Sequence, residues 1–247
     1  MNAKTFFLLL LCLCIAQAAT AQKVNNGRSL ITAMKSAGKH RKPALTFEQK
    51  TIFHRPNGKA DTVTWYEAAV PGKLRIDFAP ITDGNGVFYF RNKRMMFRNH
   101  KLVNTASDQN ILQTLLMDVF QDKTEHTLFV LDSLKFDLNV FREDVWNGRK
   151  IYVVGAAKDD LKAAQFWVDK ERKTLLRVIE PKGNLLLDVH VTGYRKMGKV
   201  WQEESMLIYL NGKLVQEEYY QNIRAHKTLP TALFDPQKWT IDQPYWR

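Results

Sequence analysis

The sequence predicts an α+β fold, in which a curled antiparallel sheet of about eleven strands forms an unclosed half-barrel with helices packed in or over its concave face. Strand-like segments fill both halves of the chain. Regular turns separate them, and two of these turns, Asn147-Gly148 and Asn211-Gly212, are strong hairpin signals. A helical region lies between the two halves. Strands and helices are therefore segregated along the chain, as they are in α+β domains.

The first residues have the pattern of a cleavable export signal. Lys4 precedes an apolar stretch, residues 6–16, which is too short to cross a bilayer comfortably. Ala19-Thr20-Ala21 then supplies the small residues of a signal-peptidase site. We predict a signal peptide, residues 1–21, followed by a single domain, residues 22–247, in the bacterial periplasm. A membrane anchor is the alternative interpretation of the apolar stretch.

Both cysteines, Cys12 and Cys14, lie inside the predicted signal, so the mature chain can form no disulfide. Neither cysteine follows the small residues of a lipobox. We therefore predict a free secreted protein and not a lipoprotein.

The net charge is +12, and removal of Lys4 lowers it by one to +11. In a cytosolic protein this charge would suggest a nucleic-acid partner, but the predicted export argues against one. The basic residues are spread along strand-like segments, which is typical of solvated outer faces. Attraction to an anionic membrane surface is the alternative.

The first half reads as a short helix followed by strands. The helical pattern lies within residues 22–44, and the strand-like segments are 44–54, 61–70, 74–78, 86–91 and 94–98. In the third of these, Leu74, Ile76 and Phe78 alternate with Arg75 and Asp77, which predicts one dry face and one wet face. The next segment, 87–90, is apolar on both faces.

An apolar stripe predicts the main helix at residues 107–121. Its members lie on one side of a helix: Ile111, Leu112, Leu115, Leu116, Val119 and Phe120. Ser107 or Asp108 can cap its N-terminus, and a second short helix follows at 124–133. We expect these helices inside the curl of the sheet, where a helix that plugs a half-barrel often leaves a cavity.

The second half is predicted to be strands again, at 136–145, 149–156, 165–168, 174–180, 185–195, 200–210 and 213–223. Two adjacent carboxylate pairs, Glu203-Glu204 and Glu217-Glu218, lie on these strands. Neighbours on a strand point to opposite faces, so neither pair forms an acid/base couple by itself. We interpret them as solvated surface.

The sequence carries no signature of catalysis. No two of the six histidines have metal-ligand spacing, and the chain has neither a G-x-S-x-G motif nor a cysteine nucleophile in its mature part. We therefore predict that the protein is not an enzyme and needs no metal and no cofactor. A metal site assembled in space remains open.

Several short motifs follow the order of the predicted elements: Phe47-Glu48-Gln49, Trp65, the Pro71 turn into 74–78, Asp83-Gly84, Trp167-Val168-Asp169, and Phe234-Asp235-Pro236 with Trp239. In this order the chain resembles the periplasmic outer-membrane lipoprotein carriers, the LolA-like family, over most of residues 28–239. The resemblance implies that residues 22–247 form one LolA-like open barrel, capped by helices, whose apolar cavity takes acyl chains. Val70 is a departure, because family members often carry an arginine before the mouth proline.

The resemblance implies a periplasmic carrier that binds acyl chains of lipoproteins, or related lipids, for transport towards the outer membrane. It would be a monomer in transient contact with an inner-membrane donor and an outer-membrane acceptor, with no nucleic-acid partner. The expected cavity lining is Trp65, Leu74, Ile76, Phe78, Phe88, Phe90, Leu112, Leu115, Leu116 and Val119.

Three alternatives remain open on the sequence. The first is an envelope sensory or protein-interaction domain of the same fold with no lipid cargo. The second is an ordinary filled core in place of a cavity. The third is a periplasmic hydrolase, which would need a cluster of polar residues in the cavity.

Overall fold

The computed structural model describes residues 23–239, so the predicted signal peptide lies outside the described residues. One antiparallel sheet of thirteen strands dominates this part of the chain. Its first six strands are β1 (Ala44–His54), β2 (Ala60–Val70), β3 (Lys73–Phe78), β4 (Gly86–Phe90), β5 (Lys93–Arg98) and β6 (Lys101–Ser107). The other seven are β7 (Phe141–Trp146), β8 (Arg149–Val154), β9 (Gln165–Asp169), β10 (Leu175–Lys182), β11 (Leu185–Met197), β12 (Val200–Leu210) and β13 (Lys213–His226).

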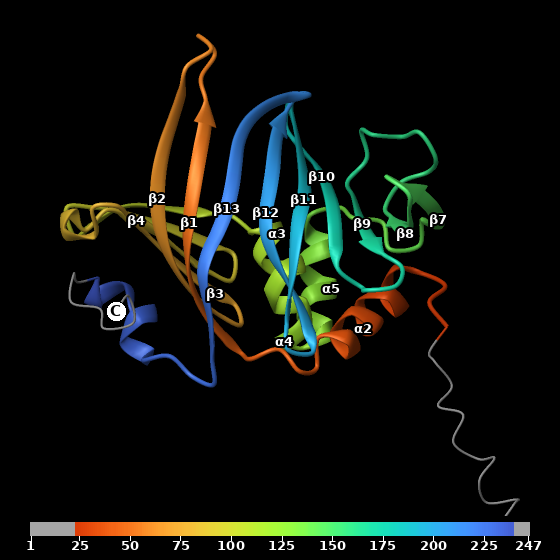
Figure 1. Ribbon diagram of the computed structural model, residues 1–247, viewed down its shortest axis with the longest axis horizontal. Coiled ribbons are helices and arrows are strands. Elements are labelled where there is room, and N and C mark those ends of the chain that lie inside the picture. The colour runs from red at the N-terminus through yellow and green to blue at the C-terminus, as the bar shows by residue number, and fades with distance from the viewer. Residues whose placement is uncertain (1–22, 240–247) are drawn as a thin grey trace, which may run out of the picture.

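The strand order is β6-β5-β4-β3-β2-β1-β13-β12-β11-β10-β9-β8-β7, so β1 and β13 join two meanders (Figure 1). Within the described residues β6 and β7 each have a single strand neighbour, so the sheet is not closed. The predicted α+β half-barrel is confirmed at this level, but the sheet has thirteen strands instead of about eleven. Sequence reasoning missed β6, whose side chains are almost all exposed and show no alternation of burial.

Both predicted Asn-Gly hairpins form. Asn147 and Gly148 have φ of 48° and 74°, and Asn211 and Gly212 have φ of 48° and 76°. Positive φ at both turn residues matches the right-handed twist of the flanking strands, so each pair makes a tight two-residue turn. These turns set the registers of β7 with β8 and of β12 with β13.

The first helix of the described residues is α2 (Gly27–Ala37), which begins with a capping box. The Ser29 backbone N–H donates to Asn26 Oδ1 at 2.8 Å, and the Asn26 N–H donates to Ser29 Oγ at 3.1 Å. Two of the backbone donors at the start of the helix are thereby satisfied.

The predicted helix at 107–121 begins later and is not regular. It consists of α3 (Ile111–Gln113), a π-helical turn η2 (Thr114–Asp118) and α4 (Val119–Gln121), and we call residues 111–121 the central helical segment. Ser107 ends β6, and the cap is Asn110, whose Oδ1 accepts from the Gln113 N–H at 3.1 Å. The predicted caps were therefore wrong. The second helix, α5 (Thr124–Ser133), forms as expected.

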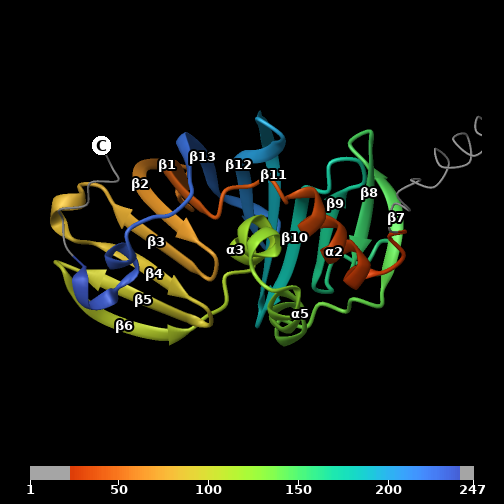
Figure 2. The ribbon, with the colours of Figure 1, turned by 90° about the horizontal axis from the view of Figure 1, so that it is seen from below.

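The main core lies between the helices and strands β8 to β12. Figure 2 shows α2 and α5 on the inner side of the curve of these strands, with α3 near the middle of the molecule. Leu30 and Ile31 of α2, Leu115 of the central helical segment and Leu131 of α5 pack with the inner side chains of the sheet in one cluster. The helices therefore cover the concave face, as predicted.

The opposite face of β3 to β5 is also covered, which corrects the predicted wet face of β3. Arg75 and Asp77 are 0% and 4% exposed and form an ion pair, with Nε donating to Oδ2 at 2.7 Å and Nη2 to Oδ1 at 2.8 Å. Arg75 Nη1 also donates to the Leu233 carbonyl at 3.1 Å.

The cover is a C-terminal segment, residues 229–239, with short 3₁₀ turns η3 (Thr231–Phe234) and η4 (Pro236–Lys238). Trp239 stacks on Phe97 with ring centroids 4.1 Å apart, and its Nε1 donates to the Gly84 carbonyl at 3.2 Å. Both faces of this part of the sheet are therefore dry, which explains why 87–90 is apolar on both sides.

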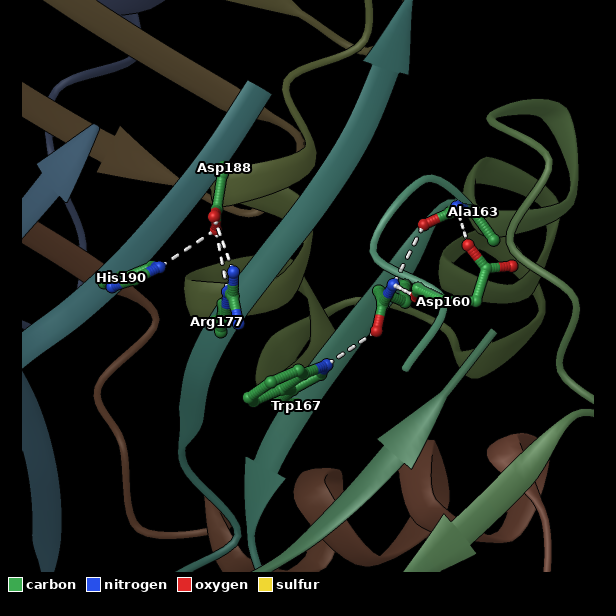
Figure 3. Close-up of polar contacts among 7 residues, drawn as sticks. Asp160, Ala163, Trp167, Arg177, Asp188 and His190 are labelled. Carbon is green, nitrogen blue, oxygen red and sulfur yellow. Dashed lines mark hydrogen bonds and ion pairs between the residues drawn. The ribbon is translucent and has the colours of Figure 1, made fainter. Parts of the chain in front are cut away.

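Polar contacts connect β10 and β11 (Figure 3). Arg177 donates to both carboxylate oxygens of Asp188, at 2.8 and 2.6 Å, and His190 Nε2 lies 3.1 Å from Asp188 Oδ1. Burial raises the pKa of Asp188, but the hydrogen bonds from Arg177 and His190 outweigh it and lower the pKa to about 2. The carboxylate therefore stays ionised and holds β10 against β11.

The side-chain amide of Gln165 fixes the start of β9, and Figure 3 labels its partners Asp160, Ala163 and Trp167. Its Nε2 donates to the carbonyls of Asp160 and Ala163, at 2.6 and 3.2 Å, and its Oε1 accepts from Trp167 Nε1 at 2.9 Å. The loop before β9 is thereby attached to the strand that it enters.

Candidate functional site

A pocket of about 330 Å³ lies between the concave face of the sheet and the central helical segment, and we call it the central pocket. Its apolar wall is formed by Leu45, Phe47, Trp65, Ala69, Leu74, Ile76, Ile111, Leu112, Leu116, Met117, Leu187, Met206 and Ile223. The volume is at the lower end of the range typical of small-molecule sites. The space between helix and sheet is therefore not completely filled by side chains.

A second pocket of about 550 Å³ adjoins the first, with Leu45, Met117 and Gln202 in both walls. Its lining includes His40, Arg41, Lys42 and Lys199. The central pocket thus adjoins a space that is lined in part by basic side chains.

Half of the predicted lining residues meet in the central pocket: Trp65, Leu74, Ile76, Leu112 and Leu116. Phe78 lies beside them and packs on Trp65, with ring centroids 5.2 Å apart. Leu74 and Ile76, at alternate positions of β3, therefore both lie on the pocket side of the sheet.

The remaining four predicted residues lie elsewhere. Leu115 and Val119 face the core with α2, because the apolar stripe of the central helical segment is wide enough to serve both the core and the pocket. Phe88 and Phe90 lie on the opposite face of the sheet, under the C-terminal segment. The ring centroids of Phe88 and Phe234 are 6.5 Å apart there.

A band of polar side chains crosses the concave face, and no sequence pattern indicated it. It consists of Glu67 on β2, Gln49 on β1, Gln216, Glu218 and Tyr220 on β13, and Gln202 and Glu203 on β12, all of which line the central pocket. Glu203 and Glu218, interpreted above as solvated surface, are only 8% and 7% exposed. The sheet side of the pocket therefore carries a polar band among apolar side chains such as Phe47 and Ile76, and Leu112, Leu116 and Met117 line the helical side.

Glu218 is the best-satisfied carboxyl of this band. Gln216 Nε2 donates to its Oε1, and the Tyr220 hydroxyl donates to its Oε2. Burial raises the pKa of Glu218, although hydrogen bonds from Tyr220, Gln216 and Gln49 oppose the shift.

Two members of the band have a buried carboxylate oxygen without a hydrogen-bond partner, Oε1 of Glu67 and Oε2 of Glu203, and the Arg41 guanidinium lies 3.6 Å from the latter. The Glu67 side chain is 3% exposed and lines the pocket. Burial, and then the charge of Glu218, raise the pKa of Glu67 well above its ordinary value. Both causes favour the protonated form of this carboxyl.

Arg41 connects the central helical segment to the sheet. Its guanidinium lies 4.1 Å from the ring centroid of Phe120 and donates to the Leu116 carbonyl at 3.2 Å. On the sheet side it donates to the Trp201 carbonyl and lies 3.6 Å from Glu203 Oε2. One buried arginine thus bonds to both walls at the border of the two pockets.

Asp118 makes a second connection, at the opposite side of the segment. Its Oδ1 accepts from the Gly72 N–H at 2.9 Å, in the turn between β2 and β3. Burial raises the pKa of Asp118 to about 6, and the hydrogen bond from Gly72 opposes the shift.

This raised pKa predicts a pH-dependent stability. Between about pH 4 and pH 6 the folded state binds more protons at Asp118 than the unfolded state does, so stability falls as pH rises through this window. Asp118→Asn keeps an oxygen for Gly72 but cannot ionise. In urea unfolding, we expect the free energy of unfolding of this variant to rise by about 2 kcal/mol relative to that of wild type as the pH is raised from 4 to 7. A difference in free energy of unfolding that stays constant with pH would contradict this assignment.

Within residues 23–239 no group of three or more His, Cys, Asp or Glu side chains is arranged to hold a metal ion. In the same residues, no helix has the length and apolar character needed to cross a membrane.

Neither a scan against protein-family models nor a search of curated protein sequences finds a match. Solved structures with the same fold do match. A domain from Vibrio parahaemolyticus, described as an outer membrane lipoprotein-sorting protein, aligns with a TM-score of 0.59 and 14% identity over 85% of this chain and 96% of its own.

Two further structures align equally well. A LolA superfamily protein from Nitrosomonas europaea has a TM-score of 0.59 and 10% identity over 86% of this chain and 98% of its own. A DUF1329 family protein from Desulfovibrio piger has a TM-score of 0.59 and 17% identity over 85% of this chain and 95% of its own. At these identities the likeness establishes a LolA-like fold, as the sequence resemblance predicted.

Proposed function

We propose that this protein, whose fold is LolA-like, is a periplasmic carrier that binds an acyl chain of a lipoprotein or a related lipid in the central pocket for transport towards the outer membrane. The observation that carries the proposal is the unfilled apolar space between the sheet and the central helical segment. Export by the signal peptide, residues 1–21, and a single mature domain, residues 22–247, belong to the same proposal.

The mechanism is binding without covalent chemistry. Each methylene that leaves water contributes roughly 0.8 kcal/mol, so a chain of about ten methylenes gains about 8 kcal/mol before the cost of its immobilisation. A pocket of about 330 Å³ suits one chain better than several. Further chains of an anchor would have to use the adjoining pocket of about 550 Å³.

Entry and release require the central helical segment to move relative to the sheet. Val70, which stands where the related carriers often have an arginine, packs against the cluster under the C-terminal segment and away from the pocket. Arg41 and Asp118 supply polar contacts between segment and sheet. Exchange of cargo with a donor or acceptor partner would therefore require these contacts to break.

The polar band raises the question of a hydrolase. A pair of carboxyl groups that catalyses hydrolysis needs one ionised member as base or nucleophile. Burial raises the pKa of both Glu67 and Glu218, so neither environment favours the ionised carboxylate that this chemistry requires. We therefore favour ligand binding over catalysis.

A protein-interaction domain without lipid cargo is the second candidate. Leu102 and Val103, on the edge strand β6, are 52% and 53% exposed. An apolar edge strand can pair with a strand of another protein.

The experiment that tests the carrier proposal is native mass spectrometry of the mature chain, purified gently from a bacterial periplasm. We expect stoichiometric acylated adducts, and we expect Leu116→Glu to lose them while circular dichroism stays unchanged, because the substitution places a charge in the apolar wall. Phe129→Glu is the matched control, since Phe129 is 64% exposed on α5. A ligand-free mass, with no uptake of offered lipid or acylated peptide, would refute the proposal.

A further inference from the structure

We propose that the central pocket selects an amphiphile with a positively charged polar end, of the alkylammonium class, and that Glu67 and Glu218 hold this end. The inference rests on the proposed function and specifies the ligand of the same site. The apolar chain would lie against the helical wall, and the charged end would meet the polar band on the sheet.

The unpartnered oxygen of Glu67 is the first reason. Glu67 is 3% exposed and lines the pocket, and its Oε1 has no hydrogen-bond partner. Buried polar atoms in native proteins are nearly always hydrogen-bonded, so an orphaned acceptor at a pocket wall indicates a donor supplied from outside the chain.

The neighbouring donors are already committed. Gln49 lies on β1, which is paired with both β2 and β13. Its Nε2 donates to Thr51 Oγ1 at 2.8 Å, and its side chain also forms a hydrogen bond with Glu218. Gln216 and the Tyr220 hydroxyl both donate to Glu218. These donors serve Glu218 and leave Glu67 to the pocket.

The charge around the pocket is the second reason. The acidic side chains in its wall are Glu67, Asp108, Glu203 and Glu218, and its basic one is Lys182. Lys182 pairs with Glu180 at 3.4 Å, outside the pocket wall. Two of the acidic residues have a basic partner. Asp108 Oδ2 lies 2.9 Å from Arg94 Nε, and Glu203 Oε2 lies 3.6 Å from Arg41 Nη2.

Glu67 and Glu218 are therefore the two carboxyls of the wall that lie outside the ion pairs just described. They are carried by β2 and β13, on either side of β1. The phenols of Tyr220 on β13 and Tyr89 on β4 also line the pocket, and burial raises the pKa of both. A cation placed between the two carboxyls would stabilise their ionised forms.

An ammonium group fits this arrangement chemically. It carries three hydrogen-bond donors and no acceptor, and its bonds to carboxylates are charge-assisted. An alcohol of the same chain length can offer Glu67 one hydrogen bond but no charge. A carboxylate brings a negative charge and no donor, so it would be repelled by whichever of the two glutamates is ionised. The expected order of affinity is therefore amine, then alcohol, then carboxylate.

The test compares dodecylamine, dodecanol and dodecanoate, each below its micellar concentration, by displacement of the neutral fluorescent probe Nile red from the mature protein. At pH 7.5 we expect the amine to bind at least tenfold more tightly than the alcohol. At pH 5 the ratio of the amine's affinity to the alcohol's affinity should shrink severalfold, because the free-energy cost of ionising Glu67 is higher at that pH. Glu67→Gln should bring the ratio at pH 7.5 close to one, whereas Glu171→Gln, which removes the same charge from an exposed turn, should leave it unchanged.

The outcomes separate the two proposals. If the alcohol or the carboxylate binds as tightly as the amine, the charge selectivity is refuted and the carrier proposal stands. If none of the three binds, either by displacement of Nile red or by direct calorimetry, both proposals fail. The wild-type comparison at two pH values decides the question even if Glu67→Gln does not fold.

Discussion

Replacement of Asp77 by alanine is expected to lower the free energy of unfolding by about 3–5 kcal/mol. Asp77 accepts two hydrogen bonds from Arg75, at 2.7 and 2.8 Å, and both side chains are buried between the sheet and the C-terminal segment. Alanine would take this carboxylate away from a buried guanidinium. Removing one partner of a buried ion pair costs more than the net contribution of the intact pair.

Urea unfolding followed by circular dichroism measures the effect, and the chain offers a matched control. Asp61 forms an ion pair of 2.6 Å with Arg55, but both side chains are about half exposed. Asp61→Ala should cost no more than about 1 kcal/mol, as surface ion pairs do. Equal losses for the two variants would show that burial of the Arg75–Asp77 pair does not set its energetic role.

Replacement of Arg41 by methionine is expected to lower the free energy of unfolding by about 2–4 kcal/mol and to loosen the central helical segment. Methionine keeps much of the apolar contact with Phe120 but leaves the Leu116 and Trp201 carbonyls without this donor. It also removes the cation beside Glu203, whose pKa is already raised by burial.

Hydrogen exchange of residues 111–121, together with urea unfolding, measures this prediction. Arg195→Met is the control, because Arg195 pairs with Glu204 at 3.1 Å on the neighbouring strand but is half exposed. We expect faster exchange in the central helical segment only for Arg41→Met. Unchanged exchange there would mean that Arg41 does not hold the segment on the sheet.

The sequence predicted most of the elements because their signals are local. Alternation, Asn-Gly turns and the apolar stripe depend on residues within one or two turns of the chain, and they located β1, β3 and α5 closely. The cap at Asn110 was missed because Ser107 has the same local preference, and only strand pairing with Lys93 commits Ser107 to β6.

What each face of a strand contacts could not be predicted, because distant residues decide it. Arg75 and Asp77 look solvated until Leu233 and Trp239, far along the chain, cover them. Glu203 and Met206 both line the central pocket, although strict alternation would place them on opposite faces. The register of β11 with β12 shifts around Gly193, and such a bulge changes which side chains share a face.

The pairing of β1 with β13 has a consequence for how the pocket comes into being. Every other ladder of the sheet joins strands that follow one another in the chain, whereas this ladder joins Ala44 to His226. Closing so long a loop is the entropically costliest step of the topology. Gln49 and Tyr220 sit opposite each other on this seam, and both line the pocket. Two correctly folded meanders that have not yet met would therefore hold no ligand, and the capacity to bind is acquired only when β1 and β13 are joined.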